Sequence, residues 1–184
     1  DEMSSRGLGD VYKRQEHMKS RILSINKKFL YDELKNFEVL LIPGFQGINN
    51  KGELTTLGRG GSDTSAVAVA AAMETECIIY TDVEGVFTTD PNIVPKAKKI
   101  NKISYEEMLE LASQGAKVLQ TRSVELAMRK NTKLSVRSSF KPKKIGTMIT
   151  DEKSILENNT VSGITYSKDE AKITLSRVQD LSLI

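Results

Sequence analysis

A glycine-rich segment ahead of an apolar helix carries the side chains best suited to chemistry. Residues 55–63 read TTLGRGGSD and run directly into the apolar block at 66–73. Glycines leave backbone N–H groups open to an anion, and the amino terminus of a helix adds partial positive charge. Arg59 adds a planar guanidinium that suits a carboxylate or phosphate, and Asp63 can organise a lysine or a metal. A plain turn is the alternative, but the two charged side chains favour a ligand-binding loop.

A second group of polar residues follows a short apolar run. Residues 77–82 read CIIYTD, which predicts a buried strand that ends at Thr81 and Asp82. Residues 83–87 predict a turn into a second strand, which Pro91 closes because proline cannot continue a β ladder. Ligands of open α/β sheets gather outside the carboxyl ends of strands, so both polar residues are well placed to touch one. Taken alone, the segment is equally compatible with Asp82 as an ordinary turn residue.

The elements that must position these residues alternate between helices and strands. Hydrophobic patterning predicts helices at 26–34, 62–73, 104–115 and 123–130, and further strands at 38–43, 134–137 and 146–149. Ser104 and Glu107 have the spacing of a capping box, and Gly115 ends the helix that they begin. The helix at 62–73 has no polar face, which places it between layers. The pattern predicts an α/β fold, a three-layer α/β/α sandwich with a mostly parallel sheet.

Composition excludes several classes of protein. The 184 residues include 27 Lys and Arg against 24 Asp and Glu, with 5% aromatic residues and no Trp. This balance argues against a nucleic-acid partner, and the lysines at 141–144 are expected to form a solvated loop. Cys77, as the single cysteine, excludes an internal disulfide and is expected to be a small buried apolar group, and the single His17 does not support a metal cluster or a histidine-based triad. No stretch suits a membrane span or a signal peptide, so a cytoplasmic protein is expected.

Together, these segments resemble the aspartate kinases, a family within the amino-acid kinase superfamily. The matching text is GFQG at 44–47, TTLGRGGSD at 55–63, TDVEGVFTTDP at 81–91, SYEEMLELASQGAKVL at 104–119, RSVELA at 122–127 and VRSSF at 136–140. The similarity runs in register from about residue 21 to about residue 180, which is more specific than any one motif. It implies ATP-dependent phosphorylation of the side-chain carboxylate of L-aspartate to 4-phospho-L-aspartate, the first step of lysine, threonine and methionine biosynthesis.

The resemblance also implies roles for the residues of the glycine segment. Arg59 would hold the substrate carboxylate, because a bidentate guanidinium fixes its orientation. Gly60, Gly61 and Ser62 would line the substrate and phosphate end of the site. Asp63 would be the catalytic residue that orders the lysines neutralising the transferred phosphate. One of those lysines belongs to an amino-terminal loop of the family that has no match here.

On the nucleotide side, the resemblance implies that ATP contacts Thr81, Asp82, Phe87, Asn92, Lys117 and Val118. Mg²⁺ is implied as a nucleotide-bound ion, because phosphates need a hard cation and no all-protein metal site is visible. Phe87 and Asn92 stand where many relatives have Tyr and Arg, so we expect weaker nucleotide contact and no change of reaction. As an alternative to ATP contact, Lys117 is an exposed cation at a helix end.

The resemblance divides the chain into a kinase part, a linker and the opening of a small ACT-like regulatory domain at 16–149, 150–159 and 160–180. A hairpin is predicted in the last of these, and an isolated hairpin is marginal in water. Residues 1–15 and 181–184 do not resemble the family. They read as the translation of a sequencing adapter, with DVYKRQ at one end and LSLI at the other, and are expected to be non-native. We therefore expect a truncated fragment with impaired catalysis.

Two other functions stay open at this point. Another superfamily enzyme, such as a glutamate 5-kinase or a uridylate kinase, would share the signals at 81–82 and 90–91. It is not expected to combine the glycine segment at 58–63 with an ACT-like tail. A non-catalytic regulatory subunit of an aspartate kinase would consist mainly of ACT domains. The intact parent is expected to be an oligomer that binds a feedback amino acid, with neither nucleic acid nor membrane as a partner.

Overall fold

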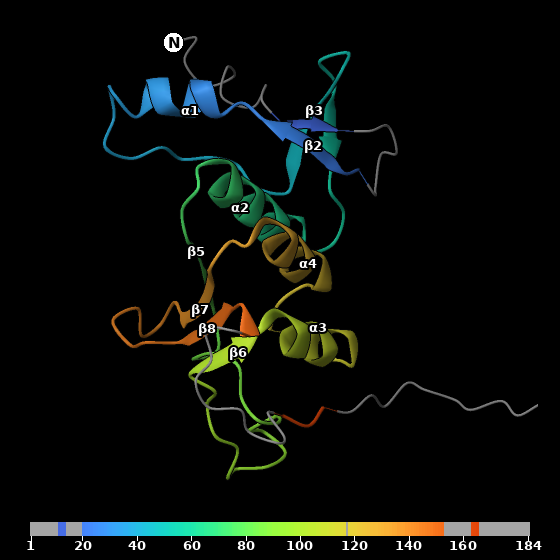
Figure 1. Cartoon of the computed structure of the whole chain (residues 1–184), viewed down its shortest axis with the longest axis vertical. Helices are drawn as coiled ribbons and strands as arrows, with labels where there is room; N and C mark the ends of the chain where they lie inside the picture. The colour runs from blue at the N-terminus through green and yellow to red at the C-terminus, as the bar shows by residue number, and fades with distance from the viewer. Residues whose placement is uncertain (1–10, 14–19, 117, 153–162, 166–184) are drawn as a thin grey trace, which may run out of the picture.

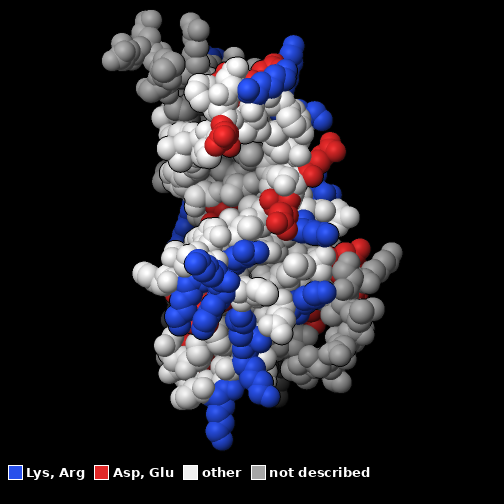
Figure 2. Space-filling view, turned by 90° about the vertical axis from the view of Figure 1, so that its left-hand side faces the viewer, with Lys and Arg blue, Asp and Glu red and all other residues white. Residues whose placement is uncertain are grey.

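Two small sheets with a helical layer between them form the framework of the chain (Figure 1). The structure, a computed structural model, describes residues 11–13, 20–116, 118–152 and 163–165. Within these ranges it contains eight strands and four α-helices. The fold class is confirmed as α/β. Basic side chains gather over the half of the molecule that holds the second sheet, whereas both signs of charge are mixed over the other half (Figure 2).

The first sheet has the strand order β2-β1-β3-β4 and consists of β1 (Val11–Lys13), β2 (Ile22–Ile25), β3 (Gln46–Asn49) and β4 (Leu54–Thr56). β1 pairs antiparallel with β2 and parallel with β3. β3 and β4 form an antiparallel hairpin whose turn contains Gly52 at φ +80°. The sequence analysis missed this hairpin, although Asn, Lys and Gly at 50–52 are a turn signal. The residues that form β1 fall within 1–15, which were expected to be non-native.

The second sheet has the order β5-β7-β8-β6 and consists of β5 (Cys77–Thr81), β6 (Lys102–Ser104), β7 (Leu134–Ser138) and β8 (Thr147–Thr150). β5 runs parallel to β7, with Thr81 opposite Ser138, and β6 runs parallel to β8. β7 and β8 are antiparallel because a short connection reverses the chain between them. The predicted strands at 77–82, 134–137 and 146–149 are therefore confirmed.

All four predicted helices are confirmed as α1 (Lys27–Glu33), α2 (Gly61–Ala72), α3 (Tyr105–Ser113) and α4 (Thr121–Lys130). The capping box of α3 is complete. The Ser104 hydroxyl accepts a hydrogen bond from the Glu107 amide at 3.1 Å, and the Glu107 carboxylate accepts one from the Ser104 amide at 3.0 Å. Gly115, which follows the helix, has φ +111°. This is the left-handed conformation that glycine adopts readily at a helix end.

The main core lies where α2, α3 and α4 meet the second sheet. Its fully buried members are Val67, Ile103, Met108, Val124, Ala127, Leu134, Val136 and Ile149. α2 contacts β5 of the second sheet and β2 and β3 of the first, which confirms that this apolar helix lies between layers. Cys77 belongs to the same core, and burial raises the pKa of its thiol to about 11. It is therefore a buried apolar group, as predicted.

The predicted buried strand at 38–43 is wrong. These residues form no strand, and the side chains of Val39 and Leu41 are 82% and 97% exposed. An apolar run becomes a strand only where a neighbouring strand offers free backbone groups, and none of the described strands pairs with it. The second strand expected after 83–87 is likewise reduced to a single bridge between Phe87 and Lys99.

Some predictions fall outside the described residues. They include His17, Lys117 and most of the predicted hairpin at 160–180, of which 163–165 are described. β8 extends to Thr150, one residue into the predicted linker. None of the described helices has the length and apolar character needed to cross a bilayer.

Candidate functional site

A cavity of about 490 Å³ and another of about 610 Å³ open in the described part of the chain, and the larger one gathers residues predicted to bind a nucleotide. This larger cavity, called here the β5 cavity, is lined by Thr81, Asp82, Phe87, Asn92 and Val118 together with neighbouring loop residues. Lys117, predicted beside them, lies outside the described residues. The cavity lies at the carboxyl end of β5, where an open α/β sheet usually holds its ligand.

One part of the β5 cavity is formed by Thr81 and Asp82, at the carboxyl end of β5. The backbone amide and the hydroxyl of Ser139 both donate to the Thr81 carbonyl, at 2.8 and 2.9 Å. The Thr81 hydroxyl donates to the Asp82 carboxylate at 3.0 Å. The backbone of Thr81 is therefore fixed by the residue that follows β7, and the exposed Asp82 carboxylate keeps acceptor capacity for a ligand.

A glycine and a buried hydroxyl hold the turn that follows. Gly85 has φ +146°, and a Cβ there would lie 2.6 Å from the Thr147 hydroxyl oxygen. That hydroxyl accepts from the Val86 amide at 2.8 Å and donates to the Ile100 carbonyl at 2.6 Å. Only glycine fits this close approach. The role of Thr147 was not predicted, because this residue lies far along the chain from the turn. The only sequence signal for the close contact was Gly85, the glycine in VEGV.

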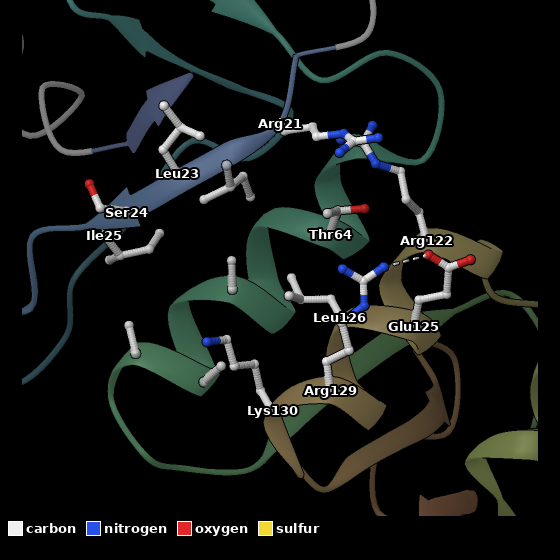
Figure 3. A pocket seen from close by; sticks show the side chains of 14 residues that line it. Arg21, Leu23, Ser24, Ile25, Thr64, Arg122, Glu125, Leu126, Arg129 and Lys130 are labelled. Carbon is white, nitrogen blue, oxygen red and sulfur yellow. Dashed lines mark hydrogen bonds and ion pairs between the residues drawn. The ribbon is translucent and has the colours of Figure 1, made fainter. Parts of the chain in front are cut away.

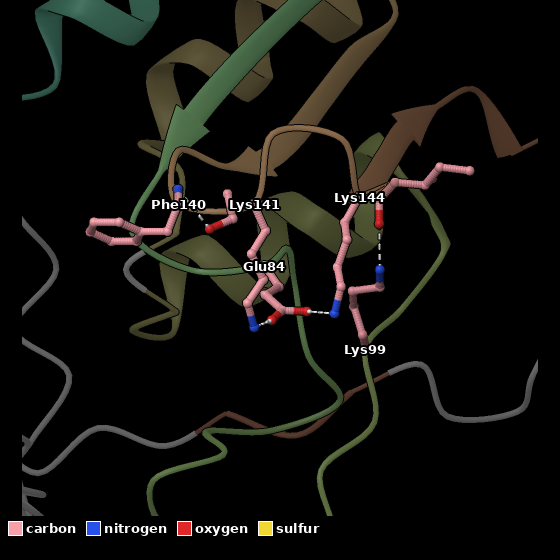
Figure 4. Close-up of polar contacts among 7 residues, drawn as sticks. Glu84, Lys99, Phe140, Lys141 and Lys144 are labelled. Carbon is pink, nitrogen blue, oxygen red and sulfur yellow. Dashed lines mark hydrogen bonds and ion pairs between the residues drawn. The ribbon is translucent and has the colours of Figure 1, made fainter.

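An ion-pair cluster ties the same turn to the connection between β7 and β8 (Figure 4). The Glu84 carboxylate pairs with Lys141 and, at 3.7 Å, with Lys144. The hydrogen bond from Lys141 is the main cause that lowers the pKa of the Glu84 carboxyl. Lys99 donates to the Ile145 carbonyl of the same connection. The lysine-rich loop is exposed, as predicted, and two of its lysines also pair with Glu84, whose neighbours on both sides in the turn line the cavity.

An Asx turn shapes another part of the cavity lining. The Asp90 carboxylate accepts from the Asn92 amide at 2.8 Å, and the Asp90 carbonyl accepts from the amides of Ile93 and Val94 at 3.1 and 2.9 Å. This turn places the exposed Asn92 at the rim. The sequence analysis took Pro91 as the end of the unit and did not assign this role to Asp90.

A short segment from beyond the predicted linker completes the cavity. The Ile164 amide donates to the Thr88 carbonyl at 2.7 Å, and the Thr165 hydroxyl donates to the Gln114 carbonyl at 3.2 Å. Ile164 and Thr165 also line the β5 cavity. The chain after the kinase-like region therefore returns to the candidate nucleotide site, which sequence patterns did not indicate.

The glycine segment forms the amino terminus of α2, as predicted. Gly60 is the N-cap residue at φ +71°, and a Cβ there would lie 2.0 Å from the Gln120 side chain. A Cβ on Gly61 would lie 2.6 Å from Leu57. The Thr64 hydroxyl donates back to the Gly60 carbonyl at 3.1 Å. Close packing on both sides therefore requires both glycines.

The charged residues of this segment lie apart from the β5 cavity. Arg59 is exposed and makes no ion pair within the described part of the chain. Ser62 is exposed, and a Cβ on Gly44 would lie 3.3 Å from its Cα. Burial raises the pKa of the half-buried Asp63 carboxyl, and a hydrogen bond with the Gln120 backbone opposes this shift. Neither Arg59 nor Asp63 lines the β5 cavity, so the structure brings the two predicted groups together only in part.

Comparison with known proteins identifies the family. The model of the amino acid kinase family matches residues 3–138. The chain belongs to the amino acid kinase family. Within this family, the aspartate kinase of Pseudomonas putida is 52% identical over 166 residues, which cover 89% of this chain and 40% of that protein. The aspartokinase of Helicobacter pylori is 51% identical over 164 residues, 86% of this chain and 40% of that protein. This chain thus spans about 40% of the length of these relatives.

Solved structures of amino acid kinases agree with this assignment. Aspartokinase III of E. coli, solved with aspartate and ADP, superposes with a TM-score of 0.70 at 34% identity, over 79% of this chain and 33% of that one. The same enzyme solved with lysine and aspartate gives 0.67 at 33% identity, over 80% and 34%. The aspartate kinase of Synechocystis gives 0.58 at 51% identity, over 66% and 20%.

Proposed function

We propose that this chain is part of an aspartate kinase, which transfers the γ-phosphoryl group of ATP to the side-chain carboxylate of L-aspartate. The β5 cavity carries the proposal, because it collects Thr81, Asp82, Phe87, Asn92 and Val118 at one strand end. About half of the residues are identical to those of aspartate kinases, which favours this reaction over those of other family members. The match of residues 3–138 to the kinase model disfavours a regulatory subunit.

The β5 cavity is the proposed site of ATP. Its volume of about 610 Å³ falls within the range of roughly 300–1,000 Å³ that small-molecule sites have. Phe87 offers an aromatic face to the adenine or ribose, and Thr81 and Asn92 offer polar contacts. No group of three or more His, Cys, Asp or Glu side chains suited to a metal lies within the described residues. Mg²⁺ would therefore arrive with the phosphates of the nucleotide, and Lys117 is proposed to approach them.

The amino terminus of α2 is the proposed site of L-aspartate. Arg59 has a guanidinium without an ionic partner among the described residues, and it directly precedes the amino terminus of α2, whose partial positive charge favours an anion. Phosphoryl transfer depends mainly on positioning and charge neutralisation. A carboxylate oxygen of aspartate attacks the γ-phosphorus, an O–P bond forms, and the bond to the β,γ-bridging oxygen breaks to release ADP. No proton transfer is needed, which suits a site without histidine.

We further propose that the chain alone has impaired catalysis. Asp63 has no ion pair with any described lysine, and Arg59 and Asp63 line no part of the β5 cavity. The intact enzyme is proposed to be cytoplasmic, oligomeric and regulated by a feedback amino acid. The E. coli relative solved with lysine and aspartate supports such an effector.

Two experiments test these proposals. Calorimetry of the chain with ATP and Mg²⁺ should show binding, and absence of binding would contradict the nucleotide site. A chimera in which this chain replaces the matching 40% of the Pseudomonas putida enzyme should form aspartyl hydroxamate from ATP, aspartate and hydroxylamine. A folded chimera without this product would overturn the aspartate kinase proposal. The chain alone should give far less product than the chimera.

The role of Arg59 is tested in the same chimera. Arg59→Ala should raise the KM for aspartate strongly and leave the KM for ATP nearly unchanged. A lost partner of a charged group costs about 2–5 kcal/mol where the pair is buried in the complex. Equal losses for both substrates would refute the assignment of Arg59 to the substrate carboxylate.

A further inference from the structure

A second cavity, of about 490 Å³, lies between β2, α2 and α4 (Figure 3). None of the residues that line it lines the β5 cavity. Its floor is apolar and comes from all three elements, with Ile25 of β2, Ala68 and Ala71 of α2 and Leu126 of α4. The small alanine side chains of α2 leave the room that a larger residue would fill.

Basic side chains surround this apolar floor. The cavity is lined by Arg21, Arg122, Arg129 and Lys130 against one carboxylate, that of Glu125. Arg129 pairs with Glu125 at 3.4 Å, an i,i+4 pair along α4. This pair leaves the other basic groups without a carboxylate among the residues described around the cavity. The lining therefore carries a net positive charge beside apolar surface.

Arg21 and Arg122 place two positive charges at one end of the cavity (Figure 3). The two guanidinium groups point toward one another at one end of the cavity, next to Thr64 (Figure 3). Arg122 donates to the carbonyls of Leu57 and Ser20 at 2.9 and 2.7 Å, so its guanidinium is fixed by neutral acceptors only. Each guanidinium has five N–H donors, and those of Arg21 have no acceptor within the described chain. Two like charges that point toward one another are stabilised by an anion between them.

We propose that this cavity binds a small organic oxyanion that has a short aliphatic chain. A carboxylate or phosphate group would lie between Arg21 and Arg122, where charge-assisted hydrogen bonds are strongest. The aliphatic chain would lie on Ala68, Ala71 and Leu126. The volume of about 490 Å³ suits a small molecule. This site does not depend on the proposed kinase activity.

The cavity also adjoins the glycine segment. Arg122 holds the carbonyl of Leu57, which directly precedes Gly58 within that segment, and Thr64 lines the cavity while donating to the Gly60 carbonyl. An anion bound to Arg122 would therefore contact the same side chain that fixes the start of the segment. The binding experiment does not depend on this connection to the glycine segment, because it measures only whether a ligand binds in the cavity.

Hexanoate is the probe that tests the site. Acetate is the control for the aliphatic chain of the ligand, and hexylammonium is the control for the sign of its charge. Calorimetry or ligand-observed NMR with the whole chain should show that hexanoate binds and that acetate and hexylammonium bind far more weakly. Arg21→Gln should weaken hexanoate binding about tenfold or more, because it removes a charge-assisted hydrogen bond to the carboxylate. Lys51→Gln removes the same charge from an exposed turn outside the cavity and should leave binding unchanged.

Two further measurements keep the proposal open to refutation. Ala71→Leu extends a side chain into the floor and should weaken hexanoate binding without removing any charge. Saturating ATP should not displace hexanoate, because the β5 cavity shares no lining residue with this one. Absence of hexanoate binding, equal binding of hexylammonium, full affinity in folded Arg21→Gln and Ala71→Leu variants, or displacement by ATP would each overturn the proposal.

Discussion

The β5 cavity and the glycine segment differ in how completely the described chain builds them. The turn that lines the cavity is fixed through backbone groups by Ser139 and Thr147. These two residues are about 60 positions further along the chain, directly after β7 and in β8. The glycine segment also has a well-packed backbone, held by Gln120 and Leu57. Its charged side chains, in contrast, have no ionic partner within the described residues.

This difference shows which parts of a site a local framework can prepare. Main-chain geometry needs only close packing and glycine, and both regions have these. The exposed guanidinium of Arg59 is solvated by water, and only a ligand or another segment can give it a fixed ionic partner. The β5 cavity therefore should bind its ligand with the present chain, whereas the glycine segment should show its function only in the complete enzyme.

The largest effect is expected from Gly85→Ala. A Cβ at this position meets the Thr147 hydroxyl at 2.6 Å and the backbone φ of +146° is strained for alanine, so the cavity wall must shift. We expect ATP binding to weaken more than tenfold and stability to fall by about 1–3 kcal/mol. Calorimetry with ATP and urea unfolding measure the two effects.

Gly52→Ala is the matched control for Gly85→Ala. Gly52 also has a positive φ, +80°, but a Cβ there has no neighbour within 4 Å. It should lose about 1–2 kcal/mol of stability through backbone strain alone and keep its ATP affinity. Equal loss of ATP binding in both variants would show that the effect reports stability and not the cavity wall.

The helices and the end of β5 were predictable because their signals are local. The capping box at Ser104 and the apolar run before Thr81 each lie within a few residues of the element that they define. The same locality explains why the polar residues at 81–92 gather in one cavity. The roles proposed for them come from a family resemblance, which the patterns alone did not provide.

The features that were not predictable depend on contacts between distant segments. The apolar run at 38–43 has the composition of a strand, but it forms one only if another strand lies beside it. The bond between Val86 and Thr147 joins residues 61 positions apart. The second cavity needs β2, α2 and α4 to meet, and no single segment contains a pattern for that.

Gly60→Ala makes the same kind of change in the glycine segment. A Cβ there would lie 2.0 Å from Cγ and 2.7 Å from Cβ of Gln120, so Gln120 must shift, and φ +71° adds backbone strain. We expect a stability loss of about 1–2 kcal/mol in urea unfolding and an unchanged ATP affinity. A loss of ATP binding as large as that of Gly85→Ala would mean that the two regions form one site.

Asp63→Asn tests the charge that this segment carries. Burial raises the pKa of the Asp63 carboxyl above its ordinary value of 3.8, so the folded chain binds this proton at higher pH than the unfolded chain does. Ionisation of Asp63 therefore costs stability above the raised pKa, and this cost disappears as pH falls to 3.8 and below. The variant should be more stable than the parent near neutral pH, and the difference should vanish in acid. Urea unfolding at several pH values measures it, and a less stable variant at neutral pH would indicate a stabilising partner for the carboxylate.

The smallest effect is expected from Glu84→Gln, which removes the ion pairs between the turn after β5 and the connection from β7 to β8. Lys141 lowers the pKa of the Glu84 carboxyl below its ordinary value of 4.5, so the pairs stabilise the fold above this value and are lost as pH falls through the lowered pKa. The variant should be slightly less stable at neutral pH and lose ATP affinity no more than a few-fold. High salt should remove both differences, because these groups are exposed.

The pair between Asp32 and Lys35 provides the control for Glu84. It is also exposed, lies at the carboxyl end of α1, and contributes nothing to the β5 cavity. Asp32→Asn should give a similar small change in stability with no change in ATP affinity. If Glu84→Gln behaves identically, the cluster is only a surface feature. If its loss of ATP affinity is greater and sensitive to salt, the connection from β7 to β8 helps to hold the nucleotide wall in place.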